Sequence, residues 1–523
     1  MFDAIVIGSG PAGVFTAYGL ESRDILMLDT GHEPPAHPPL EGNLYELRRR
    51  APDLFDWLIG QRFEGLHNVH QRANSLKLKA PYMSYIIKDW ERLSPVVSES
   101  FDAVASFALG GLANAWGAGV YRFSDADLAG FPVSAAELGP FYDALTAHIG
   151  VSGTNDDLAR FFGADGVLQP PLRLSQFATR MLEDYARSQP FFERSGIYLG
   201  RPRLAVLTRP HDGRPSYACD NLEFFEPRNP AIYNPVFTLE QLINKGAVQY
   251  ARPYLALRYA ELQDRIQVIA RNLESGGEER FEARRLFLAA GTLNTTKIVL
   301  RSANDCETRL PLLDNPMSCL PLFRLDQIGL PLDIHDSSLA QLNLVYHYGE
   351  TGVTLQGTIY GATGPMRSDV IFDLPLTIGA NLQWTKYLAP AMGLLMLFYP
   401  AMPRAENYIR LRPEGELEIH YQVPTLGRAE GALAAKLLRA GCVSSARLCK
   451  YPKMGSSIHY AGTLPMKHHP AKYQTDAEGR LAGSCRVYVT DGACFTHLPA
   501  KNLTFTIMAN AMRIARCAGK DRA

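Results

Sequence analysis

A glycine motif near the start of the chain constrains the fold more than any other feature of the sequence. Residues 4–7 form a short apolar, β-branched run, which is typical of a buried parallel strand. The sequence Gly8-Ser9-Gly10-Pro11-Ala12-Gly13 follows directly, and residues 14–20 then have a helical pattern. A G-x-G-x-x-G between a strand and a helix is the first turn of a βαβ unit. The sequence therefore predicts an α/β fold with a Rossmann-like domain.

The same motif predicts a ligand, because each glycine has a separate task. Gly8 permits the tight turn, Gly10 lets a pyrophosphate approach the backbone, and Gly13 lets the helix pack on the strand. The phosphates would lie at the helix N-terminus. A second buried strand, residues 25–28, ends at Asp29, whose carboxylate can accept from ribose hydroxyls. A glycine turn that only connects two elements is the alternative. We predict dinucleotide binding by Gly8, Gly10, Pro11, Ala12, Gly13 and Asp29.

Length and charge narrow the class of protein. The chain has 523 residues, which favours two domains or one nucleotide-binding domain with large insertions. Lys plus Arg and Asp plus Glu both number 53, so no net field favours nucleic acid or an anionic membrane. The eight cysteines are scattered without C-x-x-C spacing, which predicts free thiols and no metal site.

Two further features bear on location. The first strand begins by about residue 3, which leaves no room for a signal peptide, so we expect a cytoplasmic protein. The long uncharged stretch Tyr387–Pro403 contains three prolines and falls short of a spanning helix. We interpret it as a core strand with flanking loops and expect no membrane insertion.

The middle of the chain alternates between the expected nucleotide domain and excursions from it. Residues 31 to about 80 contain several prolines and a charged segment with a helical pattern at residues 44–50, which suggests a lid or an interface arm. A glycine-rich loop around one tryptophan, residues 110–119, indicates backbone lying against something flat or bulky. A capping box, Ser134 to Glu137, predicts a helix to about His148. Residues 151–235 look loop-rich, with one strand at 204–207.

In the later segments we expect the chain to return to the nucleotide-binding sheet and to form a second, inserted sheet. We expect a helix at residues 238–243, strands at 254–259, 266–270 and 285–288, and a helix at 294–301. Period-two alternation then marks residues 342–348, 353–360, 408–411 and 417–421, which favours a mostly antiparallel sheet. We assign residues 1–35, 100–150, 200–315 and 452–523 to the nucleotide-binding domain. The substrate-binding domain and lid or arm excursions take residues 36–99, 151–199 and 316–451.

The C-terminal segment carries the candidate chemistry. Residues 456–463 read Ser-Ser-Ile-His-Tyr-Ala-Gly-Thr, and a strand at 486–490 ends in Asp491-Gly492, where ligands of such sheets lie. Asn502 opens a final helix to about Ala518 and serves as its N-cap in one interpretation. The positive end of that helix can face a developing negative charge.

Together these residues resemble the glucose–methanol–choline (GMC) oxidoreductase family of FAD enzymes. The resemblance rests on the N-terminal glycine motif with Asp29, the Gly110-Gly111 loop with Trp116-Gly117, and Ala289-Ala290-Gly291. It rests equally on residues 459–463, on Asp491-Gly492 and on Asn502. It covers both ends of the chain, and the middle third is similar only in architecture. Within the family, the chain looks closer to the pyranose oxidase and sugar-acid dehydrogenase branch.

The resemblance implies a role for each matching residue. His459 would be the catalytic base for the substrate hydroxyl, and Asn502 would hold the same oxygen. The flavin would lie beside Gly110, Gly111, Asn114, Trp116 and Gly117. Asp491 and Gly492 would contact the ribityl–phosphate part of FAD. The flavin ring would contact Asn502, Leu503 and Thr504. The ADP half would lie along Ala290 and Gly291. FAD should be noncovalent, because Ala115 stands where tethered members have a histidine. Leu503 also departs from the family, which commonly has proline there.

The resulting hypothesis is an FAD-dependent oxidoreductase that oxidises a CH–OH group of a sugar, polyol or related alcohol. The electron acceptor is unknown. The alternatives are a non-redox flavin enzyme on the same fold and a flavin-binding module without catalysis. Among the remaining histidines, His468 and His469 are expected in exposed loops, and His497 is a second candidate for the pocket.

Overall fold

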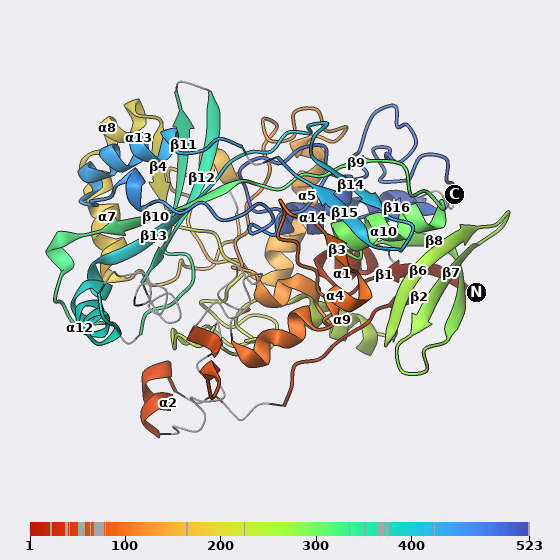
Figure 1. Cartoon of the computed structure of the whole chain (residues 1–523), viewed down its shortest axis with the longest axis horizontal. Helices are drawn as coiled ribbons and strands as arrows, with labels where there is room; N and C mark the ends of the chain where they lie inside the picture. Colours follow the sequence, from red (N-terminus) through yellow and green to blue (C-terminus); the bar gives the residue numbers. More distant parts are fainter. Residues whose placement is uncertain are drawn as a thin grey trace.

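The computed structural model describes residues 1–20, 24–36, 40, 42–50, 58–62, 64–66, 78, 80–163, 166–223, 225–333, 335–349, 352–362, 371, 376–422 and 424–520. Within these residues the strands form three sheets, the largest near the two termini and the next at the opposite end of the molecule (Figure 1). The α/β fold with a Rossmann-like domain and a mostly antiparallel second sheet is confirmed.

The first sheet has seven strands in the order β5-β2-β1-β8-β7-β6, with β16 also paired to β8. Their bounds are β1 Phe2–Ile7, β2 Ile25–Leu28, β5 Val248–Ala251, β6 Tyr254–Glu261, β7 Ile266–Asn272, β8 Glu278–Leu288 and β16 Val487–Val489. Strands β5, β2, β1, β8 and β16 run parallel, and β6 and β7 form an antiparallel extension. The central strands are buried on both faces, which explains their continuous apolar sequences.

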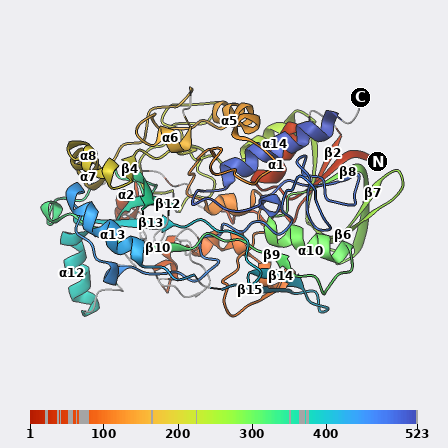
Figure 2. The ribbon, with the colours of Figure 1, turned by 90° about the horizontal axis from the view of Figure 1, so that it is seen from above.

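A group of helices packs beside this sheet: α1 Pro11–Gly19, α5 Ala135–Ile149, α9 Pro235–Asn244 and α14 Thr504–Lys520. Helices α1 and α14 lie together in both views (Figures 1 and 2). They approach closely at Gly19, where a Cβ atom would stand 2.9 Å from the carbonyl oxygen of Met512. The capping box predicted at Ser134 and Glu137 begins α5 as expected. Helix α10, Thr292–Ser302, packs against β6.

The second sheet has five strands, β10 Met317–Phe323, β13 Met392–Phe398, β12 Val353–Gly361, β11 Leu342–Tyr348 and β4 Ile197–Gly200, in that order. All of its neighbours pair antiparallel. Helices α7 Gln176–Arg187, α8 Gln189–Arg194 and α13 Arg428–Leu437 lie at this end (Figure 2). Side chains of α7, α8 and α13 share a core cluster with the sheet, so this end buries a hydrophobic core of its own.

The third sheet corrects one expectation. Strands β3 Val96–Val97, β15 Leu417–His420, β14 Tyr408–Leu411 and β9 Leu310–Pro311 form a separate four-stranded sheet. The alternating segments at 342–360 and 408–421 therefore do not share one sheet. Alternation reveals that one face of a strand is covered, but it carries no information about which strand is the neighbour.

One other expectation for local structure was wrong. Residues 204–207 form no strand but only isolated bridges, from Leu204 to Gly119 and Ser152 and from Val206 to Ile232. These side chains are fully buried, so the apolar run reflects a core segment whose backbone pairs with loops. The region 151–235, expected to be loop-rich, also contains α6 Ala159–Phe162, α7, α8 and β4.

The remaining helices are short, apart from α12. They are α2 Leu44–Arg50, α4 Trp90–Leu93, α12 Ile378–Leu388 and the 3₁₀ helices η1 Glu64–Leu66, η3 Pro81–Ile87, η4 Gly111–Ala115, η5 Leu325–Gln327, η6 Ala389–Ala391, η7 Leu438–Ala440, η8 Ala446–Leu448 and η9 Gly492–Cys494. The core strand expected within Tyr387–Pro403 is β13. In the part of the chain that the structure describes, no helix is both long and apolar enough to cross a membrane.

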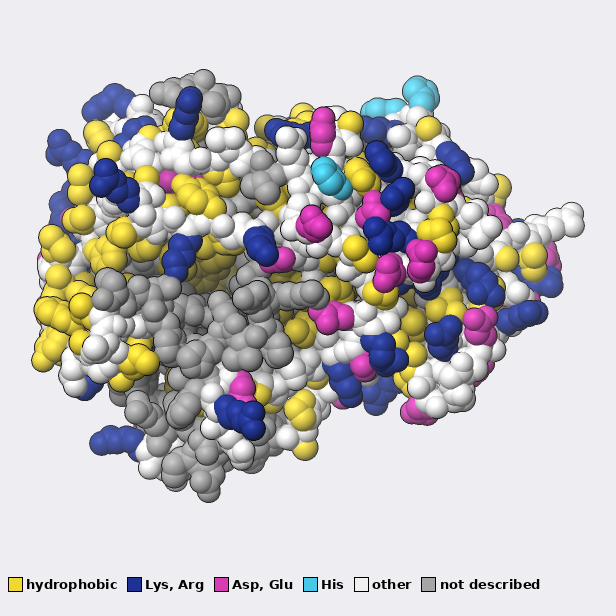
Figure 3. All heavy atoms as spheres, viewed as in Figure 1, with side chains coloured by type: hydrophobic (Ala, Val, Ile, Leu, Met, Phe, Trp, Pro, Cys, Tyr) yellow, Lys and Arg dark blue, Asp and Glu magenta, His cyan; other side chains and the backbone are white. Residues whose placement is uncertain are grey.

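Basic and acidic side chains are interspersed over the right half of the visible face, whereas the charged side chains at its left end are mainly Lys and Arg (Figure 3). The division into two discontinuous domains stays a prediction. So does the role of the arm at residues 36–99, because segments 37–39, 41, 51–57, 63, 67–77 and 79 lie outside the described residues.

Candidate active site

A cavity of about 990 Å³ extends from the glycine turn after β1 to the second sheet. Its wall includes residues of the β1–α1 turn, of the loop 104–117, of β6, α10, β10 and β13, and of the C-terminal segments 456–460 and 491–507. Segments that are hundreds of residues apart in the chain thus share one wall. The volume lies at the upper end of the range for small-molecule and cofactor sites, about 300–1,000 Å³.

Of the three glycines in the turn after β1, only Gly10 has open space where a side chain would stand. Gly8 has φ +99°, and a Cβ there would lie 2.6 Å from the carbonyl oxygen of Ala289. A Cβ on Gly13 would overlap the carbonyl oxygen of Gly8. A Cβ on Gly10, which lines the cavity and precedes α1, would meet no atom within 4 Å. The N-terminus of α1 therefore offers an uncovered backbone surface, which suits the pyrophosphate of a dinucleotide.

Asp29 lies on the cavity wall at the end of β2. Its Oδ2 accepts from the Ser9 hydroxyl and, at 3.1 Å, from the Tyr250 hydroxyl. The Ser9 oxygen in turn accepts from the backbone N–H of Gly110, at 3.0 Å. Burial raises the pKa of Asp29 to about 6, against the lowering effect of these hydrogen bonds. These hydrogen bonds hold the carboxyl group in place on the cavity wall.

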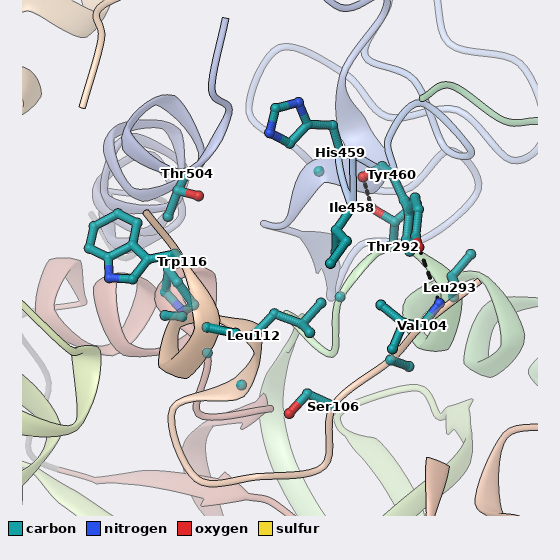
Figure 4. Close-up of a pocket in the computed structure, with 18 of the residues that line it drawn as sticks. Val104, Ser106, Leu112, Trp116, Thr292, Leu293, Ile458, His459, Tyr460 and Thr504 are labelled. Atoms are coloured by element: carbon teal, nitrogen blue, oxygen red, sulfur yellow. Dashed lines mark hydrogen bonds between the residues drawn. The ribbon is translucent and has the colours of Figure 1, made fainter. Parts of the chain in front are cut away.

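The glycine-rich loop contributes both wall and scaffold. Gly111, Trp116 and Gly117 line the cavity, whereas Gly110 and Asn114 do not. The Asn114 amide donates to the carbonyl oxygens of Leu109 and Gly111, at 3.0 and 2.7 Å, so it stabilises the loop from within. The Trp116 indole donates to the carbonyl oxygen of Tyr233, at 3.0 Å, which fixes the ring on one side of the cavity (Figure 4).

Asp491 and Gly492 line the cavity where β16 ends, together with Ala290 and Gly291 from the end of β8. The Asp491 carboxylate accepts from the Thr295 hydroxyl of α10 and, at 3.0 Å, from the Ala493 backbone N–H. Burial raises its pKa to about 6. This carboxylate therefore links α10 to the strand end and to η9, which fixes the relative position of two parts of the wall.

His459 lies on the cavity wall next to Ile458, across from Trp116 and Thr504 (Figure 4). Its Nδ1 is 2.9 Å from Oδ1 of Asn315, and its ring stacks on Phe398 with 5.3 Å between ring centres. Among the described residues Nε2 has no hydrogen-bond partner, and it is not closed off from the cavity. Burial lowers the pKa of His459 to about 4, so the ring is neutral near pH 7.

Asp314 holds the backbone of the segment that carries His459. Its carboxylate accepts from the backbone N–H groups of Gly455, at 2.7 Å, and His459, at 3.2 Å, and from the Ser457 hydroxyl. Within this segment Ile458 has φ +58°, a strained conformation for a β-branched residue. Strain of this kind persists only where the surroundings enforce it, and Asp314 supplies part of that enforcement.

Asn502 and Thr504 line the cavity at the start of α14, and Leu503 does not. The N-cap interpretation of Asn502 was wrong. Helix α14 begins at Thr504, and the Leu503 carbonyl accepts the first helical bond, from Ile507 N–H at 2.9 Å. The Asn502 side chain makes no hydrogen bond to another described residue, so it is available to a ligand. Asparagine is common at helix starts, and sequence alone does not separate position N′ from the cap.

The other histidines lie elsewhere. His468 and His469 are exposed and outside helices and strands, as expected. His497 places Nε2 at 2.9 Å from the carbonyl oxygen of Asp127 and is not among the described residues that line the cavity. Groups of metal-ligating side chains are absent from the described part of the chain.

Three residues of the site have no signal in the sequence. Asp314 and Asn315 follow β9 and reach the His459 segment only through the tertiary fold. Lys297 of α10 is 4% exposed and lines the cavity, with the Ser94 hydroxyl 3.4 Å from its Nζ. Burial lowers the pKa of Lys297 to about 7. A lysine within a helical segment normally marks an exposed face, so its burial could not be foreseen.

Comparisons with known proteins bear on the family and on the fold. Residues 442–511 match the sequence model of the GMC oxidoreductase family. The fold is similar to the crystal structure of pyridoxine 4-oxidase from Mesorbium loti, with a TM-score of 0.58 and 15% sequence identity over 99% of each chain. No curated protein matches the sequence. The C-terminal match, together with a shared fold along the whole chain, confirms the resemblance to the GMC oxidoreductases.

Proposed function

We propose that the protein is an FAD-dependent oxidoreductase that oxidises a CH–OH group. The observation that carries this proposal is a single cavity with the open Gly10 turn at one part of its wall and the neutral, accessible imidazole of His459 at another. The GMC match over residues 442–511 and the shared fold support it.

The residues present fit FAD, which when bound supplies the hydride acceptor, N5 of its ring. The α1 N-terminus and the uncovered backbone of Gly10 would bind the pyrophosphate. Asp29 would accept from a ribose hydroxyl, and Trp116 and Thr504 would lie beside the ring system. We propose noncovalent binding, because Ala115 offers no imidazole for a covalent link.

The proton of the substrate hydroxyl would go to Nε2 of His459. A neutral ring with one free nitrogen can accept it, and burial keeps the ring neutral over a wide pH range. The Asn502 amide would donate to the same oxygen and hold it during the reaction. General base catalysis of this kind contributes about 10²–10⁴-fold.

We propose a sugar, polyol or related alcohol as the substrate class, on the resemblance to the pyranose oxidase branch. The cavity gives room for such a molecule beside a flavin, and Asn502 adds a polar contact. A non-redox flavin enzyme and a flavin-binding module without catalysis remain the alternatives, and both would share the cofactor site.

Anaerobic mixing with a panel of alcohols, polyols and aldoses tests this proposal. The purified protein should be yellow and contain FAD, and at least one member of the panel should bleach the flavin absorbance. Dithionite serves as the control for a reducible flavin. If dithionite bleaches the flavin and no member of a broad panel does so, the non-redox alternatives are favoured instead.

A further inference from the structure

Asn315 is buried between three segments and bonds to each of them. It follows Asp314 after β9, is 1% exposed, and points its amide nitrogen at two backbone carbonyl oxygens. The Nδ2 group donates to Tyr399, at 2.7 Å, and to Pro499, at 3.0 Å. A carbonyl oxygen can only accept, so both amide hydrogens are used and the orientation of the amide is fixed.

The fixed amide decides which nitrogen of His459 carries the proton. Because Nδ2 faces the two carbonyls, Oδ1 faces Nδ1 of His459, at 2.9 Å. An amide oxygen can only accept, so Nδ1 must be the donor. A neutral imidazole carries one N–H, and the lone pair is then on Nε2, which has no partner among the described residues. The opposite tautomer would place two acceptors against each other.

We propose that Asn315 is the positioning residue that sets the tautomer of His459, and so keeps Nε2 free to accept the substrate proton. The Phe398 ring stacks on the imidazole and fixes the plane of the imidazole ring, and the hydrogen bond to Asn315 prevents that ring from flipping over. The catalytic part of this inference rests on the proposed role of His459 as base. The tautomer itself does not, because it follows from the hydrogen bonds alone.

The tautomer can be measured without any substrate. In holoenzyme labelled with ¹⁵N-histidine, the ¹⁵N spectrum distinguishes a protonated from an unprotonated ring nitrogen, and a His459→Gln variant assigns the signals. Wild type should show N–H at Nδ1 and a lone pair at Nε2 near pH 7. A signal showing N–H at Nε2 in the wild type would overturn the inference, whatever the enzyme oxidises.

Two variants separate positioning from mere structure. Asn315→Leu removes the acceptor, so the tautomer with N–H at Nε2 should become the major one, and flavin reduction should slow by about 10- to 100-fold, the cost of leaving the buried Nδ1–H without a hydrogen bond. Asn315→Asp keeps an acceptor for Nδ1–H, although its second oxygen replaces the amide group that donates to the Tyr399 and Pro499 carbonyls, so its melting temperature should fall as in Asn315→Leu. It should retain the wild-type tautomer, reduce its flavin faster than Asn315→Leu, and move the acid limb of the pH profile upward, because a nearby carboxylate favours the imidazolium.

Asn343→Leu is the matched control. Asn343 is a fully buried asparagine in β11 that donates to the Tyr121 hydroxyl and does not line the cavity. Its loss should lower the melting temperature without changing the His459 signals. An Asn315→Leu enzyme with the wild-type tautomer and wild-type rate would overturn the proposal. If no alcohol reduces the flavin, the proposed function fails, while the ¹⁵N spectra of wild type and Asn315→Asp still test the tautomer.

Discussion

Replacement of Lys297 by methionine should stabilise the protein, and the gain should depend on pH. Lys297 is 4% exposed and forms no salt bridge with a described carboxylate; the Glu416 carboxylate acts on it only through a weaker charge interaction that opposes the effect of burial. Burial lowers its pKa from 10.5 to about 7, because the ammonium loses its hydration. Lys297→Met retains a long apolar chain of similar volume and removes the charge.

The magnitude follows from the difference in pKa between the folded and unfolded states. Each pKa unit corresponds to about 1.36 kcal/mol, so 3.5 units set a ceiling of about 5 kcal/mol at or below pH 7. Solvent in the cavity screens the charge, and we expect about 2–4 kcal/mol. Between pH 7 and 10.5 the unfolded chain binds more protons than the folded one, so wild-type stability rises with pH. The gain from Lys297→Met should therefore shrink with rising pH and vanish near pH 10.5.

Denaturant or thermal unfolding of the flavin-free protein at pH 6, 7, 8.5 and 10 measures this gain. Lys297→Arg is the matched variant, because arginine stays charged throughout and should show no gain at any pH. Lys245→Met, at an exposed lysine after α9, controls for the change of residue type. A Lys297→Met protein that is no more stable than wild type at pH 6, or whose gain is equal at pH 6 and pH 10, would refute the reasoning.

Three further predictions concern the cofactor and the base. Gly10→Val fills the open space at the α1 N-terminus and should abolish FAD binding, whereas Gly139→Val, at an equally uncrowded glycine of α5, should keep it; flavin absorbance per protein decides. Acid precipitation should release all flavin, and flavin left on the pellet would show a covalent link. Burial lowers the pKa of His459 to about 4, so kcat/KM for flavin reduction should fall only as the pH falls through about 4. A loss of rate near pH 6.5 would mean that the imidazole is solvated.

The first βαβ unit could be predicted from sequence because its signals are local. The strand, the three glycines, the helix and Asp29 follow each other within thirty residues, and the structure has them at β1, α1 and β2. The β8–α10 junction and the β16 end carry the same kind of local signal. In each, a buried strand end is followed within three residues by a glycine and leads into a turn or helix.

The errors arose where tertiary partners decide the structure. Residues 204–207 are as apolar as a strand, but they pair with loops and form only bridges. The strands at 353–361 and 408–411 alternate alike, yet they lie in different sheets. Leu503 is the cap of α14, and Asn502 lies one residue before it. The Asn502 side chain therefore does not bond to the helix N-terminus.

The support of His459 could not be predicted for the same reason. Asn315 lies 144 residues before His459, and Asp314 lies 145 residues before it. Their roles depend on the geometry of an amide between two carbonyl oxygens and of a carboxylate beneath a strained turn. A motif can indicate which histidine faces the substrate, but not which side chain orients it.

Stopped-flow reduction of the flavin in His459→Ala, under anaerobic conditions with an alcohol that reduces wild type, tests the central claim most directly. Hydride does not readily leave a carbinol carbon whose hydroxyl proton is retained, so the rate should fall by about 10²–10⁴-fold while FAD stays bound. Asn502→Ala, which removes one hydrogen bond rather than the base, should fall by less. A His459→Ala enzyme that reduces its flavin within about threefold of the wild-type rate would contradict the assignment of His459 as the base.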